Sequence, residues 1–408
     1  MKKYFIMFAI FLVLHIPPTL ADDICLEVTK VNLNIQFGGP YSEVMLGDGR
    51  LVVAGWKTVG DNPSAQAVLL CFDVDGKEIW RFETQDNLKS QFAGLLSLAD
   101  GSFVTIQHRE IPMGDTSDYI QRKYDIIHVA HDGSFINKPA FETQCDSFFP
   151  RLFAAKNGYF VFSGEREESN ANDEMITFPS LEYRDNAGNI NWKHFFTHAL
   201  YLYGVLPIED GYLLYGLEIE QQVQSFETRA VIFKMSDQGK VLWRIVIPGE
   251  NWPAINEAVQ MPDGKIIAFG IMERTVFKNG KKTAPRSFQY CISSDGALCW
   301  QKEYAPNDPG YLTFCLHHTD NGFVALIDEY DLQAPLRLAL FGTDGEIVQE
   351  FQTHPHGTRT ESSFTLKATN DAFYLLEHYR PEGMMNDYVF IMPVDQVVGR
   401  PITRRIDQ

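Results

Sequence analysis

Charged and titratable side chains recur at the end of one apolar segment in each of several similar stretches of the chain. Arginine beside glutamate can bind hydroxyl-rich or zwitterionic ligands through charge-assisted hydrogen bonds. A glutamate or histidine with a shifted pKa can act as a general acid or base. The residues at these positions, called the rim residues below, are Arg109, Glu110, Glu165, Arg166, Glu218, Glu273, Arg274, Asp328, Glu329, Glu377, His378 and Arg380.

The rim residues have two interpretations. They are a solvated rim if each segment simply meets water where it leaves the core, which is the commoner arrangement. Alternatively they form a polar funnel that binds a sugar, a peptide or a cation. In folds with short turns on one face and long loops on the other, functional sites usually lie on the long-loop face. All of the rim residues would lie on that face.

Other candidates for chemistry are weaker. Loop aromatics could stack on a sugar ring, although such residues more often fill gaps between repeated units; they are Tyr201, Tyr203, Trp252 and Tyr311. Two histidine pairs could chelate a metal ion, but no third ligand follows at a suitable spacing; they are His317 with His318, and His354 with His356. No G-x-S-x-G nucleophile motif occurs, so the sequence predicts no catalytic residue, metal or cofactor.

The charge balance restricts the partners. With 53 acidic and 35 basic residues the net charge is −18, which repels phosphate backbones. We therefore expect a protein, peptide or glycan partner, no nucleic acid, no membrane insertion and a monomer. The six cysteines are compatible with disulfides, but their pairing cannot be chosen from the sequence.

The first 21 residues resemble a secretory signal peptide. Lys2 and Lys3 precede an apolar run too short to span a bilayer, and small residues lead to a cleavage site after Ala21. The sequence thus predicts an extracytoplasmic protein, secreted or periplasmic, with residues 22–408 forming a single domain.

Internal repeats explain the spacing of the rim residues. The stretch FDVDGKEIW (72–80) returns as YRDNAGNINW, FKMSDQGKVLW and CISSDGALCW, and a stretch such as KNGYFVFSGE (156–165) precedes each copy. The turn glycines of the two stretches recur about every 50 residues: Gly76, Gly133, Gly188, Gly239, Gly296 and Gly345, and Gly49, Gly101, Gly158, Gly211, Gly264 and Gly322. Seven such units account for nearly all of residues 22–408.

Each unit has the composition of four antiparallel strands. Asp-Gly and Asn-Gly close tight hairpins because these residues tolerate positive φ. Continuous apolar strands such as LVVAGW (51–56) indicate a sheet covered on both faces. The sequence therefore predicts an all-β fold, a seven-bladed β-propeller of four-stranded antiparallel blades. Residues 26–37 are expected to add the outer strand of the C-terminal blade and close the ring.

The stretch FDVDGKEIW has two further interpretations, and both fail on spacing. A sialidase-type Asp box would place tryptophan three residues after the glycine, whereas Trp80 follows Gly76 by four. A calcium loop would need more oxygen ligands, such as a glutamate several residues after the glycine. A turn between two strands is the remaining interpretation.

The G-x-x-x-W register of GKEIW, GNINW, GKVLW and GALCW resembles the repeat of the PQQ-like, or quinoprotein-type, β-propellers. The resemblance implies a propeller in which an outer-strand tryptophan packs against the adjoining blade. Members of that family usually have eight blades and often a pair of adjacent cysteines beneath the cofactor. This chain has about seven units and no Cys-Cys pair, so the resemblance extends to the fold and not to the cofactor.

Two functions fit these observations. The first is a non-catalytic, exported propeller that serves as a binding or protein-interaction module. The alternative is a carbohydrate-active enzyme, a glycoside hydrolase or lyase, that uses rim carboxylates as acid and base.

Overall fold

The computed structural model describes residues 29–32, 36–37, 43–59, 62–84, 88–112, 120–141, 150–169, 175–221, 226–247, 253–273, 277–278, 281–282, 286–304, 312–319, 322–328, 336–353, 362–368, 373–379 and 388–393. The predicted signal peptide lies outside these residues. The described residues form strands and turns and no helix, which confirms the predicted all-β class. In particular, they include no helix that could cross a membrane.

Most of the described strands belong to six four-stranded antiparallel sheets and one five-stranded sheet. The first sheet contains β2 (Gln36–Phe37), β3 (Glu43–Met45), β4 (Leu51–Val59), β5 (Asn62–Phe72) and β6 (Glu78–Glu83). The second contains β7 (Lys89–Ser97), β8 (Phe103–Pro112), β9 (Ile120–Val129) and β10 (Phe135–Asn137). The third contains β11 (Arg151–Ala155), β12 (Gly158–Ser169), β13 (Met175–Arg184) and β14 (Ile190–Phe195).

The fourth sheet contains β15 (Ala199–Ile208), β16 (Gly211–Gln221), β17 (Phe226–Met235) and β18 (Val241–Ile247). The fifth contains β19 (Ala254–Gln260), β20 (Ile266–Glu273), β23 (Arg286–Ile292) and β24 (Leu298–Tyr304). The sixth contains β25 (Leu312–Thr319), β26 (Gly322–Asp328), β27 (Leu336–Gly342) and β28 (Ile347–Thr353). The end sheet contains β1 (Thr29–Asn32), β29 (Ser362–Ala368), β30 (Phe373–Tyr379) and β31 (Tyr388–Pro393).

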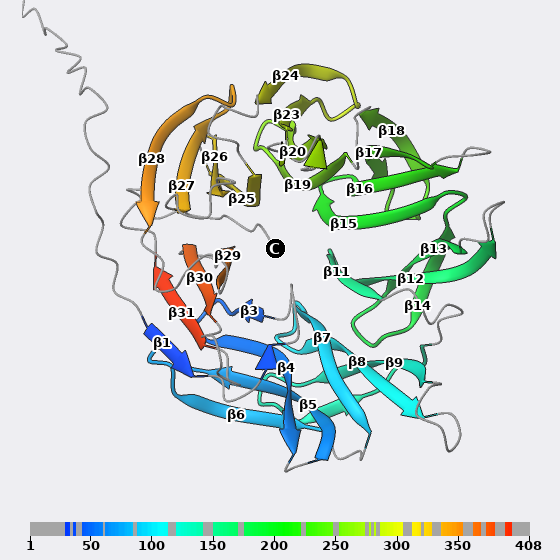
Figure 1. Cartoon of the computed structure of the whole chain (residues 1–408), viewed down its shortest axis with the longest axis vertical. Helices are drawn as coiled ribbons and strands as arrows, with labels where there is room; N and C mark the ends of the chain where they lie inside the picture. Colours follow the sequence, from blue (N-terminus) through cyan, green and yellow to red (C-terminus); the bar gives the residue numbers. More distant parts are fainter. Residues whose placement is uncertain are drawn as a thin grey trace, which may run out of the picture.

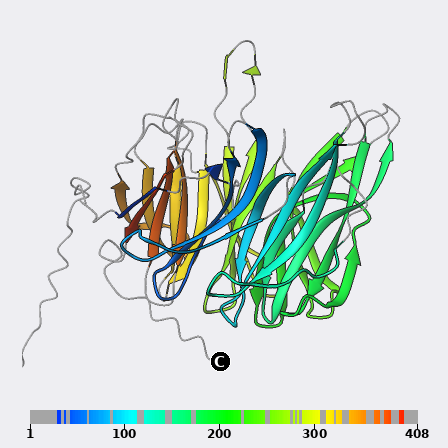
Figure 2. The ribbon, with the colours of Figure 1, turned by 90° about the horizontal axis from the view of Figure 1, so that it is seen from below.

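The sheets follow one another in chain order around a common centre, with β11, β15, β19 and β25 on the side that faces it (Figure 1). Between β20 and β23 the chain forms a small hairpin of β21 (Phe277–Lys278) and β22 (Lys281–Lys282). Figure 2 shows this hairpin standing out from one face. The arrangement is that of a β-propeller.

The core lies between neighbouring sheets. On β12, four consecutive residues are almost fully buried, Tyr159 to Phe162, which confirms that the apolar strands are covered on both faces. Phe160 and Phe162 pack with the fourth sheet, and Tyr159 and Val161 with the second. Because strand residues alternate between faces, one apolar strand serves two interfaces.

FDVDGKEIW forms the turn between β5 and β6, as predicted. Gly76 has φ of 78° and donates its N–H to the carbonyl of Asp73 at 3.0 Å. The carboxylate of Asp73 accepts hydrogen bonds from the backbone N–H groups of Asp75 and Lys77. The aspartate therefore stabilises its own turn.

Outer-strand tryptophans dock on the next sheet. Trp192 of β14 donates from Nε1 to the carbonyl of Asp237, 2.8 Å away, in the turn between β17 and β18. Its ring lies against Gly239 in that turn, where an added Cβ would come within 2.8 Å of it. The equivalent bonds are Trp80 to His131 at 3.0 Å and Trp243 to Ser294 at 3.1 Å.

The N-terminal stretch 26–37 divides between two sheets. β1 pairs antiparallel with β31, with Thr29 opposite Ile391, and is the edge strand of the end sheet. β2 instead pairs with β4 of the first sheet. Leu376 of β30 is fully buried in one cluster with Leu51 and Val53 of β4, so the end sheet packs on the first.

Candidate functional site

The rim residues Arg109 and Glu110 are engaged in ion pairs within the second sheet. On β8, Arg109 donates to the carboxylate of Asp125 on β9, and Glu110 lies 2.9 Å from Lys89 on β7. Asp125 is also 2.8 Å from Lys138. Because each charge has a partner on its own sheet, these contacts join the ends of neighbouring strands.

Glu165 belongs to a more buried network in the third sheet. It accepts a hydrogen bond from Lys193 of β14, which is also 3.1 Å from Glu182 of β13. Glu182 lies 2.6 Å from Arg184, and this pair is almost fully buried. Burial lowers the pKa of Lys193, but its hydrogen bonds to Glu165 and Glu182 outweigh burial and raise the pKa overall. Lys193 therefore stays charged, which suits a structural contact.

Besides Glu110, which lines a smaller cavity, the described rim residue that adjoins a cavity is Glu218. It lies near the end of β16, is 6% exposed, and accepts a hydrogen bond from Arg244 of β18. The imidazole Nδ1 of His198 is 4.0 Å from its other carboxylate oxygen. The side chains of Arg244 and His198 are 40% and 57% exposed, so the buried carboxylate binds one group that solvent can reach and lies near a second.

The cavity, called the large cavity below, lies between the third and fourth sheets and has a volume of about 330 Å³. Its lining residues come from the end of β14, the connection to β15 and the face of the fourth sheet: His194, Phe195, Phe196, Thr197, His198, Leu200, Glu218, Phe233, Val241 and Arg244. This size suits one or two sugar rings, and a mostly apolar wall with a few polar groups is typical of a ligand site.

His194 is held in place at the wall of the large cavity. Its ring packs edge-on against Phe196, with 4.8 Å between ring centroids, and Phe196 packs in turn on Phe233 at 5.9 Å. Burial lowers the pKa of His194, opposed in part by a hydrogen bond with the Gly239 backbone. The imidazole is therefore neutral near pH 7 and able to accept a proton.

The large cavity combines an arginine, two histidines and, among the described lining residues, a single carboxylate. A guanidinium can bind a carboxylate or stabilise developing negative charge. A neutral imidazole can remove a proton, and a second imidazole can return one. This set is suited to proton abstraction beside an acidic group.

The remaining predicted residues are placed only in part. Arg166, Glu273, Asp328, Glu377 and His378 lie on described strands, but their side chains are outside the description, as are those of His317 and His318. Arg274, Glu329, Arg380, Trp252, Tyr311, His354 and His356 lie outside the described residues. Tyr201 and Tyr203, which were expected in a loop, lie instead on β15, and Tyr201 is 39% exposed. The polar funnel stays a prediction.

Sequence reasoning missed three residues of the large cavity, His194, His198 and Arg244. One signal could have found Arg244: a basic residue directly follows the docking tryptophan in three repeats, as Arg81, Lys193 and Arg244. Each of these residues makes an ion pair with a glutamate of its own sheet. The histidines carry no repeated signal: His194 lies near the end of β14 and His198 in the connection to β15.

No protein-family model matches the chain, and no curated protein is similar to it in sequence. Among solved structures it is similar to the polysaccharide lyase Uly1, with TM-score 0.55 and 10% identity, covering 91% of this chain and 100% of the lyase. It is also similar to a puromycin hydrolase, with TM-score 0.50 and 14% identity. That match covers 92% of this chain but 55% of the hydrolase, about half of its length.

These comparisons support the propeller fold and correct the leading functional prediction. The absence of a recognisable catalytic motif in the sequence favours a non-catalytic binding module. That prediction is wrong: the two solved structures just described are enzymes, and one acts on polysaccharide by its name.

Proposed function

We propose that the protein is a carbohydrate-active enzyme of the lyase type and that its active site is the large cavity. The observation that carries the proposal is the arrangement of Arg244, held by the buried Glu218, in one cavity with His194 and His198. Hydrolysis of a glycosidic bond ordinarily uses two carboxyl groups. The single carboxylate among the described lining residues already binds Arg244, so elimination fits this cavity better than hydrolysis.

The proposed elimination cleaves a glycosidic bond next to a uronic acid. Arg244 binds the carboxylate of the sugar and stabilises the negative charge that develops when the neighbouring C5–H bond breaks. His194 takes the proton from C5. The electron pair forms a C4–C5 double bond and the C4–O4 bond breaks. O4 leaves with its electron pair and receives a proton from His198. Phe195, which is 59% exposed, offers a ring face for the sugar.

The test is a panel of polysaccharides offered to the purified protein: polygalacturonate, alginate and chondroitin as acidic polymers, and xylan and mannan as neutral ones. Elimination produces an unsaturated uronate that absorbs ultraviolet light, whereas hydrolysis produces only new reducing ends. We expect the ultraviolet signal on an acidic polymer and its loss in His194→Gln. Reducing ends without ultraviolet absorbance, or no cleavage of any polymer, would contradict the proposal.

We further propose that the sheets form seven blades and that β1 closes the ring. The proposal is supported by the pairing of β1 with β31 and by the packing of Leu376 against Leu51 and Val53. Closure removes strand edges that would otherwise pair with other chains. Deleting residues 22–37 should therefore lower the thermal midpoint markedly or make the chain insoluble. An unchanged melting curve would count against closure.

A further inference from the structure

A second cavity, called the small cavity below, lies where the first sheet meets the second and has a volume of about 160 Å³. It is separate from the large cavity and shares no lining residue with it. Its lining residues are Trp56, Ala65, Lys89, Ser90, Gln91, His108 and Glu110. The volume matches one sugar ring in size.

Besides Ser90, the polar residues of the small cavity are two adjacent pairs on neighbouring strands. Lys89 lies opposite Glu110 and Gln91 opposite His108 in the register of β7 and β8, so all four side chains are on one face of the sheet. The ion pair measures 2.9 Å, and the Gln91 amide nitrogen lies 3.3 Å from His108 Nδ1. Burial lowers the pKa of His108, which keeps its imidazole neutral. The four groups together carry no net charge.

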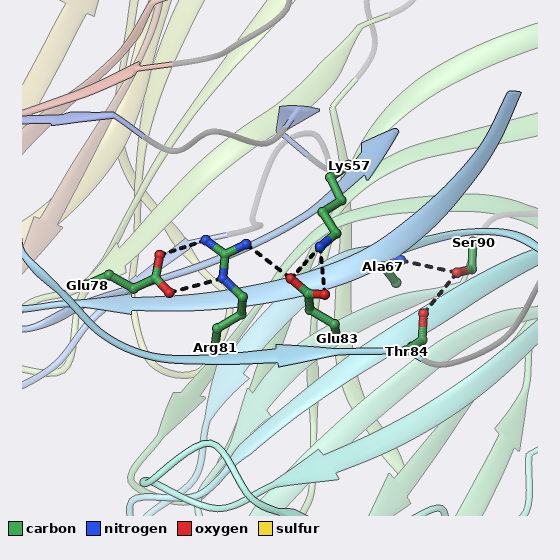
Figure 3. Close-up of polar contacts among 7 residues, drawn as sticks. All are labelled: Lys57, Ala67, Glu78, Arg81, Glu83, Thr84 and Ser90. Atoms are coloured by element: carbon green, nitrogen blue, oxygen red, sulfur yellow. Dashed lines mark hydrogen bonds and ion pairs between the residues drawn. The ribbon is translucent and has the colours of Figure 1, made fainter. Parts of the chain in front are cut away.

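Figure 3 draws contacts among the strands that border the small cavity, including those of Ser90, which lines it. Lys57, next to Trp56 on β4, donates to both carboxylate oxygens of Glu83 at 2.7 and 2.6 Å. The hydroxyl of Ser90 accepts the N–H of Ala67 at 3.1 Å and lies 3.1 Å from the hydroxyl of Thr84. The strand that carries Trp56 and the strand that carries Ser90 are thus fixed without a ligand, which reduces the entropy cost of binding.

We propose that the small cavity binds a neutral sugar unit. Trp56 supplies an aromatic surface for the apolar face of a sugar ring. The Lys89–Glu110 pair and the Gln91 amide offer both donors and acceptors to hydroxyl groups. Because the pair has no net charge, it gives no preference for an anionic sugar, in contrast to Arg244 in the large cavity. The site holds a glycan chain at the protein surface and does not depend on the proposed cleavage.

The test is calorimetric titration of the whole protein with hexasaccharides of glucose, xylose and mannose, and with oligogalacturonate as the acidic probe. We expect at least one neutral hexasaccharide to bind, and Trp56→Ala to weaken it by about tenfold or more because the stacking surface is lost. Gln91→Ala, which leaves the ring in place, should weaken it less. Arg81→Met, in the same network but outside the small cavity, should bind as the wild type does.

Three results would overturn the inference: no binding of any neutral hexasaccharide, binding of the acidic probe alone, or equal affinities in the wild type and in both cavity variants. Thermal midpoints of Trp56→Ala and Gln91→Ala identify a variant that fails to fold, and the other variant then decides. The titrations measure binding without turnover. They therefore remain informative if the lyase proposal fails. If Arg244→Met still binds the neutral hexasaccharide, the binding site lies away from the large cavity.

Discussion

The interface between the first and second sheets and the interface between the third and fourth sheets are built alike. In both, an outer-strand tryptophan donates to a carbonyl in the turn of the next sheet, Trp80 to His131 and Trp192 to Asp237. In both, a turn glycine leaves room for the ring, because an added Cβ would lie within 3 Å of it. Each interface also contains a cavity.

The two cavities differ in charge and in titratable groups. The small cavity has a neutralised ion pair, an amide and a tryptophan, whereas the large cavity has two histidines and an arginine that pairs with a buried glutamate. At the large cavity, His194 and Phe195 share β14 with the docking Trp192, whereas the small cavity is lined from β4, β5, β7 and β8 and the docking Trp80 lies on β6. The difference teaches that the same tryptophan contact between sheets is compatible with cavities of different charge. The tryptophan holds the two sheets together, and the residues that line the cavity can therefore vary.

The largest expected effect is on turnover at the large cavity. Arg244→Met removes the group proposed to stabilise the developing charge, so kcat/KM on the acidic polymer should fall about 10²–10³-fold. The matched control is Arg81→Met, which also follows a docking tryptophan and loses ion pairs to Glu78 and Glu83. It should change kcat/KM less than about twofold. Equal losses in the two variants would show that the arginine acts through folding alone.

The next effect is on stability and concerns the tryptophan contact between the third and fourth sheets. Trp192→Ala removes a half-buried ring and its hydrogen bond, so the free energy of unfolding measured in urea should fall by about 3 kcal/mol. Asn137 occupies the equivalent place on β10 and donates weakly to Ala187 at 3.4 Å. Asn137→Ala should cost about 0.5–1 kcal/mol. Similar costs for the two variants would contradict a special role for the docked tryptophan.

The pH dependence should distinguish His194 from an exposed histidine. Burial lowers its pKa, and a general base works in the neutral form, so activity should persist below the ordinary histidine pKa of about 6.5. Below the lowered pKa, kcat/KM should decline about tenfold per pH unit as the imidazole takes up a proton. Reducing burial with Phe196→Ala should move this acid limb to higher pH. A limb that does not move would exclude His194 as the base.

The smallest expected effect is that of salt. A net charge of −18 repels an acidic polymer over the whole surface, while Arg244 attracts it only at close range. Raising the ionic strength from low to physiological values screens the repulsion, so kcat/KM should increase, by about threefold. The affinity of the small cavity for a neutral sugar should not change with ionic strength. A steep decrease of kcat/KM with salt would indicate a basic binding surface instead.

Much of the fold follows from patterns that are local in the chain. The D-G turns, the continuous apolar strands and the tryptophan four residues after each turn glycine predicted antiparallel sheets that are covered on both faces. One part differed: residues 26–37 were expected to form a single outer strand, but β2 pairs with β4 while β1 pairs with β31. The apolar pattern of that stretch suits either sheet, so only packing decides where it divides.

The candidate site was predicted only at Glu218. Equivalent positions in other repeats, such as Arg109 and Glu165, end in ion pairs within their sheets just as Glu218 does with Arg244, so the amino-acid pattern does not distinguish the cavity position. His194 and Arg244 are 50 residues apart and belong to neighbouring units. Turn chemistry and strand alternation depend on a few consecutive residues and can be recognised from their order. Whether two sheets leave a space between them, and which side chains border it, depends on how their faces pack, and that is decided only when the units assemble.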